Sequence, residues 1–302
     1  MGVVYQPITG KYDGLTTQRG SFVTVGLKLT NRCNLDCYHC CRYGDYPDME
    51  LSSARTFIDS LADADVARLH FTGGEPLLHR NLQNAIGYAG RKTLKSGGKF
   101  SLSISTNGVL LTPELAHTLA PYLDSVKVSA FGIGPNYNAV TGRNGSTYSR
   151  ALQGIANAVA AGIPIHVQTS VLRENIGDLA GLARLSNDLG ASKVTLYSNI
   201  RQARGFQLTD EREVSDAEIS QAFDRLVEEQ IKSGWASDIR WRRWPNDGQY
   251  LLVFSNGELT ANPVDNPPQN FEVVGNLLED SVDDLWQRYK HQEAHVQFYA
   301  DR

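Results

Sequence analysis

The sequence predicts an α/β fold in which crossover helices cover a parallel sheet, either as an open sheet or as a partial barrel. Short β-branched runs alternate with segments of helical periodicity from residue 21 to about residue 200, which gives six strand–helix repeats. Polar, glycine-containing motifs follow successive strands, and parallel α/β folds carry their chemistry at the carboxyl ends of strands.

The expected strands and helices follow one another in regular order. Strands are expected where β-branched and alternating residues gather, at 21–29, 66–72, 100–105, 125–131, 163–171 and 193–197. Helices are expected where apolar residues recur at helical spacing, at 52–64, 82–94, 113–119, 147–161 and 176–189. The segment 206–234 combines charge with the same periodicity, which predicts a surface helix.

Composition narrows the class of protein. Hydrophobic residues make up 41% and charged residues 21% of the 302 positions, as in globular proteins. The net charge of -4 argues against nucleic acid as the main partner, because phosphate binding needs a basic surface. The sequence contains no run of 18 apolar residues and no signal-peptide pattern, so we expect neither a membrane span nor export. Clustered thiols then indicate the reducing cytoplasm.

All four cysteines lie on one short loop after the first expected strand. Cys33, Cys37 and Cys40 have C-x3-C-x2-C spacing, and Cys41 follows directly, so its side chain is expected to diverge. Thiols this close favour soft-metal ligation over disulfides. Three thiolates suit an iron–sulfur centre with one open iron. A structural zinc site completed by His39, or a run of buried thiols, are the alternatives.

Taken in order, four motifs resemble the radical S-adenosylmethionine superfamily over about residues 22–205. They are the cysteine loop, Gly73-Gly74-Glu75-Pro76, Ser105-Thr106-Asn107-Gly108 and the strand VKVSAFG. The resemblance implies a partial (βα)6 TIM-like barrel in which Cys33, Cys37 and Cys40 bind three irons of one 4Fe-4S cluster. It also implies an enzyme that cleaves S-adenosylmethionine reductively to a 5'-deoxyadenosyl radical, which abstracts hydrogen from substrate. A flavodoxin- or ferredoxin-type protein is the electron donor that we expect.

The resemblance also implies which residues bind S-adenosylmethionine. Gly73 and Gly74 let the backbone approach it closely, and Glu75 accepts hydrogen bonds from its ammonium group. The other expected ligands are Pro76 in the same turn, Ser105 and Asn107 at the ribose, Ser129 and Arg150 at the carboxylate, and Val171 at the adenine. Plainer alternatives are a simple turn for the glycine motif, a capped turn for Ser105 and Asn107, and a solvated helix residue for Arg150. His70, His117 and His166 are expected to be structural or exposed.

The resemblance divides the chain into an N-terminal arm (1–20), a radical S-adenosylmethionine barrel (21–205) and a C-terminal extension (206–302). The extension is similar to the SPASM or twitch segment, with Asn256-Gly257 as a hairpin turn, and is expected to form a small α+β cap. It lacks the cysteines that hold auxiliary clusters in that segment, so we expect one cluster.

Substrate contacts are expected at Arg240, Arg242, Trp244 and Tyr197, because cations beside aromatic faces suit a sugar, nucleotide or carboxylate. An ordinary strand with buried tryptophans and solvated arginines is the alternative. Cys41 is a possible hydrogen donor to a substrate radical; Tyr137, Tyr197 and Tyr250 are further candidates.

These features predict an enzyme that acts on a small polar metabolite, such as a sugar, nucleoside or aminoglycoside-like intermediate, in natural-product or antibiotic biosynthesis. Decarboxylation, elimination or rearrangement would suit a single cluster. Only 32 residues precede Cys33, so a leader-peptide-binding domain is not expected. A peptide-modifying enzyme and a zinc-stabilised binding protein without catalysis are the alternatives.

Overall fold

The structure is a computed structural model that describes residues 21–40, 45–198, 212–242, 250–262 and 272–291. The expected N-terminal arm, Cys41 and Trp244 lie outside the described residues. None of the helices in these ranges is long and apolar enough to cross a membrane.

The described strands form one ten-stranded sheet in the order β10-β9-β8-β1-β2-β3-β4-β5-β6-β7. Strands β1 to β7 run parallel, β8 pairs in parallel with β1, and β8 to β10 are antiparallel neighbours. Their bounds are β1 Thr24–Thr30, β2 Arg68–Gly73, β3 Ser101–Thr106, β4 Ser125–Ser129, β5 Ile165–Ser170, β6 Lys193–Tyr197, β7 Asp238–Arg242, β8 Tyr250–Val253, β9 Glu258–Asn262 and β10 Glu272–Asn276.

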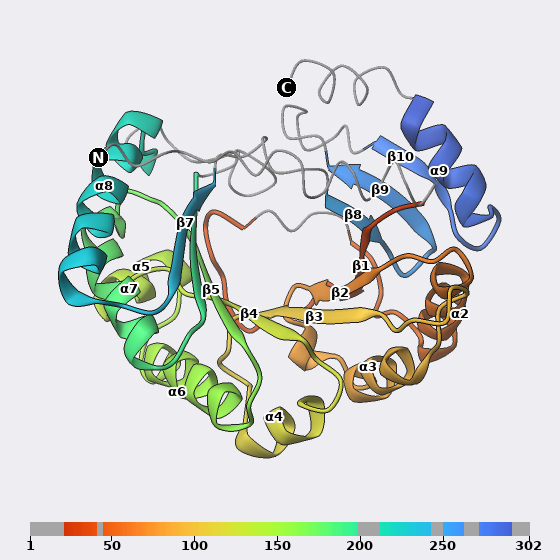
Figure 1. The fold of residues 1–302 in the computed structure, drawn as a ribbon, viewed down its shortest axis with the longest axis horizontal. Helices are drawn as coiled ribbons and strands as arrows, with labels where there is room; N and C mark the ends of the chain where they lie inside the picture. Colours follow the sequence, from red (N-terminus) through yellow and green to blue (C-terminus); the bar gives the residue numbers. More distant parts are fainter. Residues whose placement is uncertain (1–20, 41–44, 199–211, 243–249, 263–271, 292–302) are drawn as a thin grey trace.

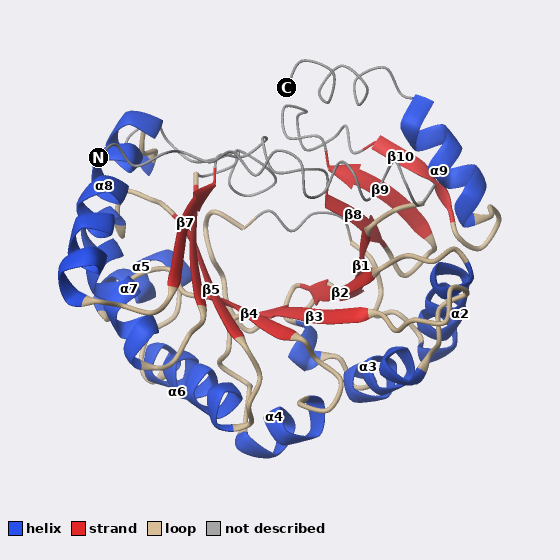
Figure 2. Ribbon diagram, viewed as in Figure 1, coloured by secondary structure: helices blue, strands red, loops and turns tan. Residues whose placement is uncertain are grey.

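The helices connect these strands and lie around the outside of the curved sheet (Figure 2). Their bounds are α2 Leu51–Asp63, α3 Leu82–Arg91, α4 Pro113–Leu119, α5 Pro135–Thr141, α6 Thr147–Ala160, α7 Leu179–Asp188, α8 Asp216–Ser233 and α9 Val282–His291, with 3-10 turns η1 Pro76–Leu78 and η2 Ile176–Asp178. The sheet curves but is not closed in the described part of the chain, because β7 and β10 lie at its two edges (Figure 1). The predicted α/β class with a partial TIM-like barrel is confirmed.

In the part of the chain between β1 and β6, the sequence prediction missed two short elements, α5 and η1; strand β10 and helix α9 near the C-terminus were not predicted either. Elements α5 and η1 both begin with a proline, Pro135 and Pro76, whose fixed backbone angle suits a first helical position. Neither is long enough to develop the apolar periodicity on which the other helices were predicted.

The C-terminal part of the chain joins the sheet at both edges. The surface helix expected in 206–234 is α8, which begins with a capping box formed by Ser215 and Glu218. Strand β7 follows it and pairs in parallel with β6, so the strand–helix alternation continues past residue 205. The expected hairpin is β8–β9, with a turn at Phe254–Gly257 closed by the Gly257 N–H on the Phe254 carbonyl at 2.9 Å. The division of the chain at residue 205 stays a prediction.

The two faces of the sheet differ in polarity. Burial alternates along β3, β4 and β5 between buried residues and partly exposed ones. Val126 and Val128 of β4 belong to the main hydrophobic core, which the outer helices complete. Lys127 lies between them and therefore faces the inner side of the sheet, as do its register partners Ser105 and His166. The inner face is polar because every second strand residue is polar.

A close contact between α6 and the end of β3 gives a test of this packing. A Cβ added to Gly154 of α6 would lie 2.1 Å from the carbonyl oxygen of Gly108, and Gly108 itself has a φ of 78°. We expect Gly154→Ala to lower the free energy of unfolding by about 1–3 kcal/mol in urea denaturation, although alanine favours a helix by up to about 1 kcal/mol. Gly177→Ala is the control, because no atom lies within 4 Å of its added Cβ. Equal stability of the two variants would contradict this packing.

Candidate functional site

The three described cysteines lie on the loop that leaves the carboxyl end of β1. All three cysteines are partly exposed when the whole residue is considered. The Leu35 N–H points at Cys33 Sγ at 3.4 Å, and the Cys40 N–H donates to the Cys37 carbonyl at 3.2 Å. Burial raises the pKa of the Cys37 thiol, and the neighbouring Cys40 and Cys33 raise it further. The three thiols are therefore close enough for their charges to interact.

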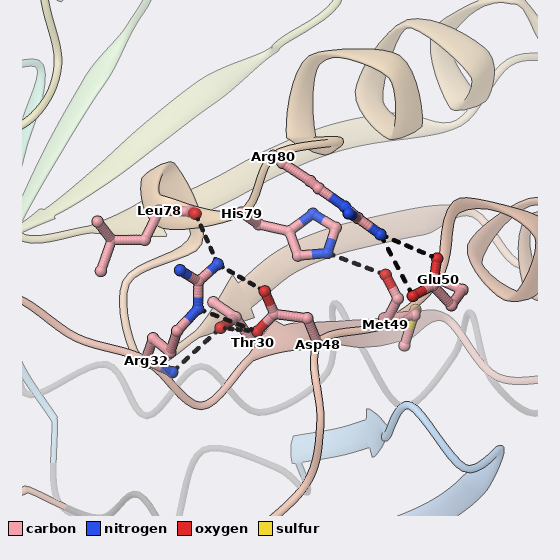
Figure 3. Close-up of polar contacts among 8 residues, drawn as sticks. All are labelled: Thr30, Arg32, Asp48, Met49, Glu50, Leu78, His79 and Arg80. Atoms are coloured by element: carbon pink, nitrogen blue, oxygen red, sulfur yellow. Dashed lines mark hydrogen bonds and ion pairs between the residues drawn. The ribbon is translucent and has the colours of Figure 1, made fainter.

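A charged clamp joins the two ends of the cysteine loop (Figure 3). Arg32 donates to both carboxylate oxygens of Asp48, at 2.5 and 3.3 Å, and also to the Leu78 carbonyl in η1 at 2.9 Å. The Thr30 hydroxyl donates to the same carboxylate at 2.5 Å. Burial alone would raise the pKa of Asp48, but the hydrogen bonds from Arg32 and Thr30 hold it below its ordinary value. The residue before Cys33 is thus fixed to both the far end of its loop and the turn after β2.

The two glycines after β2 are required by the backbone of the cysteine loop. A Cβ on Gly73 would lie 2.5 Å from the Thr30 carbonyl oxygen, and one on Gly74 would lie 2.3 Å from that of Arg32. The Gly74 N–H donates to Thr30 at 2.7 Å and the Glu75 N–H to Arg32 at 2.8 Å. The cysteine loop therefore requires glycine at both positions for contacts within the chain itself. The predicted close approach of these glycines to S-adenosylmethionine stays a prediction.

Glu75 links the turn after β2 to the turn after β3. Its side chain is fully buried and accepts hydrogen bonds from Leu77 N–H at 3.0 Å, the Thr106 hydroxyl at 2.8 Å and Asn107 N–H at 2.8 Å. Burial raises the pKa of Glu75 to about 6, although all three hydrogen bonds act to lower it. Pro76 starts η1 directly after it. Its carboxylate therefore positions two motifs, and its predicted contact with the ammonium group stays a prediction.

Asn107 and Ser105 are also engaged within the chain. The Asn107 side chain accepts from Val109 N–H at 3.0 Å, as in the capped-turn alternative, and its amide donates to Asn34 of the cysteine loop at 2.8 Å. The Ser105 hydroxyl lies 2.9 Å from Nε2 of the buried His70. The turn after β3 is thus connected directly to the cysteine loop.

The remaining predicted ligands of S-adenosylmethionine lie in different surroundings. Ser129 ends β4, on the inner face, and pairs in register with Gln168. Val171 is buried and donates its N–H to the Tyr197 carbonyl at 2.8 Å. Arg150 is exposed on α6, as the solvated-helix alternative expects. Their roles as ligands stay predictions.

The predicted substrate residues come together only in part. Tyr197, Arg240 and Arg242 share the inner face at the edge formed by β6 and β7, where Tyr197 pairs with Arg242. Trp241 points to the other side, with its ring centroid 6.2 Å from that of Phe223 on α8. Trp241 therefore does not share the face of Arg240 and Arg242, because neighbouring strand residues face opposite ways. The predicted substrate contacts of Tyr197, Arg240 and Arg242 stay predictions.

The sequence named Tyr137 as one further candidate for a hydrogen donor, and in the structure α5 brings it near the cysteines. Its side chain is 1% exposed, and its hydroxyl has no hydrogen-bond partner among the described residues. Burial raises the pKa of Tyr137, and Cys37, Glu75 and Cys33 raise it further. The seven-residue helix that carries it gave no periodic signal, so only the structure could locate this residue.

The donor set suits a thiolate-bound cluster. No three His, Cys, Asp or Glu side chains within the described ranges are arranged to hold a single metal ion. Cys33 and Cys40 nevertheless both lie within electrostatic reach of Cys37, and three thiolates held this close would need a shared cationic centre. The unpartnered hydroxyl of Tyr137 lies within electrostatic reach of two of these thiols. His39, the expected fourth ligand for zinc, is buried with its ring 4.5 Å from that of Phe131.

Comparison with known proteins gives consistent matches. A family model described as the Radical SAM superfamily matches residues 27–186. The chain is 28% identical over 235 residues to Fe-coproporphyrin III synthase of Methanosarcina barkeri, covering 74% of this chain and 56% of that protein. It is 30% identical over 256 residues to pre-heme d1 synthase of Dinoroseobacter shibae, covering 82% of this chain and 61% of that protein. The chain thus spans little more than half the length of these relatives.

The fold is shared with solved structures. SuiB of Streptococcus suis, in a crystal structure described as bound to precursor peptide SuiA, superimposes with a TM-score of 0.73 at 12% identity. The match covers 96% of this chain and 70% of that chain. At this identity the likeness concerns the fold.

The clamp at the cysteine loop predicts that substitution of Arg32 destabilises the protein more than substitution of Arg80. We expect Arg32→Gln to lower the free energy of unfolding by about 1 kcal/mol and to reduce iron bound after anaerobic reconstitution, because it removes a two-pronged contact with Asp48. Arg80→Gln, which breaks the exposed ion pair with Glu50, is expected to change the free energy of unfolding by less than about 0.5 kcal/mol. Urea denaturation and iron analysis measure both effects. Equal losses would contradict the clamp.

The buried His70 predicts a pH dependence of stability. Burial, with the nearby Lys127, lowers the pKa of His70 well below its ordinary value. The unfolded chain therefore binds a proton here between about pH 7 and pH 5 that the folded chain does not, and the free energy of unfolding falls as the pH falls through that range. We expect the slope to be smaller in His70→Asn by up to about 1.4 kcal/mol per pH unit.

Urea denaturation at a series of pH values measures this slope. His117→Asn is the matched control, since His117 lies exposed on α4. An unchanged slope in His70→Asn would contradict the assignment.

Proposed function

The chain belongs to the radical SAM superfamily, and we propose that it transforms a small polar metabolite bound against the inner face of the sheet. Enzymes of this superfamily use a 4Fe-4S cluster and S-adenosylmethionine. The observation that carries the proposal is the position of the three cysteines, which lie at the carboxyl end of β1 beside an inner face of alternating polar residues. Catalytic residues of parallel α/β enzymes gather at this end of the strands.

Cys33, Cys37 and Cys40 would hold the cluster. When bound, the cluster supplies an electron for reductive cleavage of S-adenosylmethionine, the superfamily's route to a carbon radical that abstracts hydrogen. The chain has no cysteine beyond Cys41, so one cluster is the number that its thiols support. A flavodoxin- or ferredoxin-type protein is the electron donor that we propose.

The chain's own residues then position the loop and the ligand. Arg32 and Asp48 hold the ends of the loop together, while Glu75 and Asn107 fix the neighbouring turns to it. The Tyr137 hydroxyl is a buried donor with no partner among the described residues, so it suits a polar group of S-adenosylmethionine near the thiols. These residues position the cysteine loop and orient the ligand.

A small molecule is favoured over a peptide by the names of the two relatives, a synthase of Fe-coproporphyrin III and a synthase of pre-heme d1. Decarboxylation, elimination or rearrangement of a sugar, nucleoside or related metabolite, as in natural-product biosynthesis, is the reaction class that we propose. A peptide-modifying enzyme is the second candidate, because the fold neighbour SuiB is described in complex with a precursor peptide. Incubation with reductant, S-adenosylmethionine and panels of metabolites or peptides, read by mass spectrometry, distinguishes them.

The cysteine assignment gives a direct prediction. After anaerobic reconstitution we expect about four irons per chain and reductive cleavage of S-adenosylmethionine, as the superfamily's cluster requires. Cys33→Ala, Cys37→Ala and Cys40→Ala are each expected to abolish cleavage, measured as 5'-deoxyadenosine by chromatography. Cys41→Ala is the matched control and is expected to keep the cluster.

Two outcomes would change this assignment. Loss of the cluster in Cys41→Ala would make the ligand set wrong. A Cys41→Ala chain that cleaves S-adenosylmethionine but forms no product would make Cys41 a candidate for the hydrogen donor.

A further inference from the structure

The inner face of the sheet carries a concentration of positive charge that the cysteine site does not explain. Lys127 of β4 lies at its centre, between Ser105 of β3 and His166 of β5 in the strand register. Its side chain reaches the neighbourhood of Arg68 from β2, Lys193 from β6 and Arg242 from β7, whose charges act on it. These cations come from four strands spread around the curved sheet (Figure 1).

Among the described residues of strands β2 to β7, Asp238 is the one carboxylate on this face. Asp238 of β7 accepts from Arg240 at 2.7 Å and lies 3.7 Å from Lys193. It is thus shared by two cations. No carboxylate of the described residues lies within ion-pair distance of Lys127. His166 faces the same cations. Burial and the charges of Lys193, Lys127 and Arg240 lower its pKa, whereas Asp238 acts to raise it.

The arrangement has an electrostatic cost. Burial, with the charges of Arg242, Arg68 and Lys193, lowers the pKa of Lys127 to about 8. Like charges held close at a partly desolvated position disfavour the charged form. An anion placed beside Lys127 would reduce that penalty, because an opposite charge favours the charged form of the ammonium group.

We propose that this inner face binds the substrate through oxyanions, so that the substrate carries two or more carboxylate or phosphate groups. One such group can pair with Lys127 and its neighbours Arg68 and Arg242. A second can lie beside Lys193 and Arg240, which at present share Asp238. Neutral donors on the same face, Ser125 and Gln168, supply further hydrogen bonds to oxygen. The proposal rests on the proposed function, since it assigns the chemical class of that enzyme's substrate.

The experiment measures binding of simple anions to the anaerobically reconstituted full chain. Calorimetric titrations with citrate and with inorganic triphosphate, each repeated at higher salt, are compared with titrations of glucose. We expect both anions to bind and glucose not to, with affinity falling as salt rises. Lys127→Gln and Arg242→Gln are each expected to weaken anion binding by about tenfold, the size of a charge-assisted contact.

Lys232→Gln is the matched control, because Lys232 is 76% exposed and pairs with Glu228 on α8. It is expected to leave anion binding within about twofold of the unchanged chain. Far-UV circular dichroism of each variant checks its fold, and the pair of inner-face variants keeps the test valid if one of them does not fold. Binding of citrate alone would support a polycarboxylate, and binding of triphosphate alone a phosphate ester.

Three outcomes would overturn the proposal. The first is equal affinity of the inner-face variants and the unchanged chain, and the second is equal binding of glucose. The third is loss of anion binding in saturating S-adenosylmethionine together with weaker S-adenosylmethionine binding by Lys127→Gln, which would assign the cations to the methionine carboxylate. Cleavage of S-adenosylmethionine, measured in parallel, tests the proposed function separately, because anion binding needs no turnover.

Discussion

The attachment of the cysteine loop to the turn after β2 is the constraint on which the rest of the site depends. Two backbone N–H groups, from Gly74 and Glu75, donate to carbonyls at the start of the loop, and only glycine leaves room for this approach. Arg32 then ties the start of the loop to its end through Asp48. A long irregular loop loses much conformational entropy when it is ordered, so several simultaneous contacts are needed to hold its thiols in place.

The buried carboxylate of Glu75 connects the turn after β2 to the end of β3. It is bonded by neutral donors from two turns, and Asn107, one of its partners, returns to the loop at Asn34. The three motifs therefore form a closed ring of contacts. Removing one member would leave buried polar groups unsatisfied in the others, which is why such networks act as a unit.

Most of the fold was predictable because its periodic signals are strong. The helix 113–119 and the strand 193–197 have the predicted bounds, and the other predicted elements differ mainly at their ends. The pairing of β8 with β1 was not predictable, since a four-residue strand carries no information about a distant partner. The cysteine loop was recognised from its spacing, and the strand-end motifs from their residue types, their order along the chain and the family resemblance. The unpartnered Tyr137 hydroxyl and the cations around Lys127 emerged only when the strand register placed them on one face.

The pairing of β8 with β1 has a consequence for how the chain is made. The strand that leads into the cysteines is complete at Thr30, whereas its second neighbour begins at Tyr250. At the usual speed of translation, about 5–20 residues per second, the ribosome finishes the first strand roughly 10–40 s before it makes the partner. During that interval β1, which leads to the thiols, has an open edge, and an open edge is a site for pairing with other chains. Slow synthesis of the C-terminal segment would therefore prolong the time in which unfinished chains can associate with one another through the edge of β1.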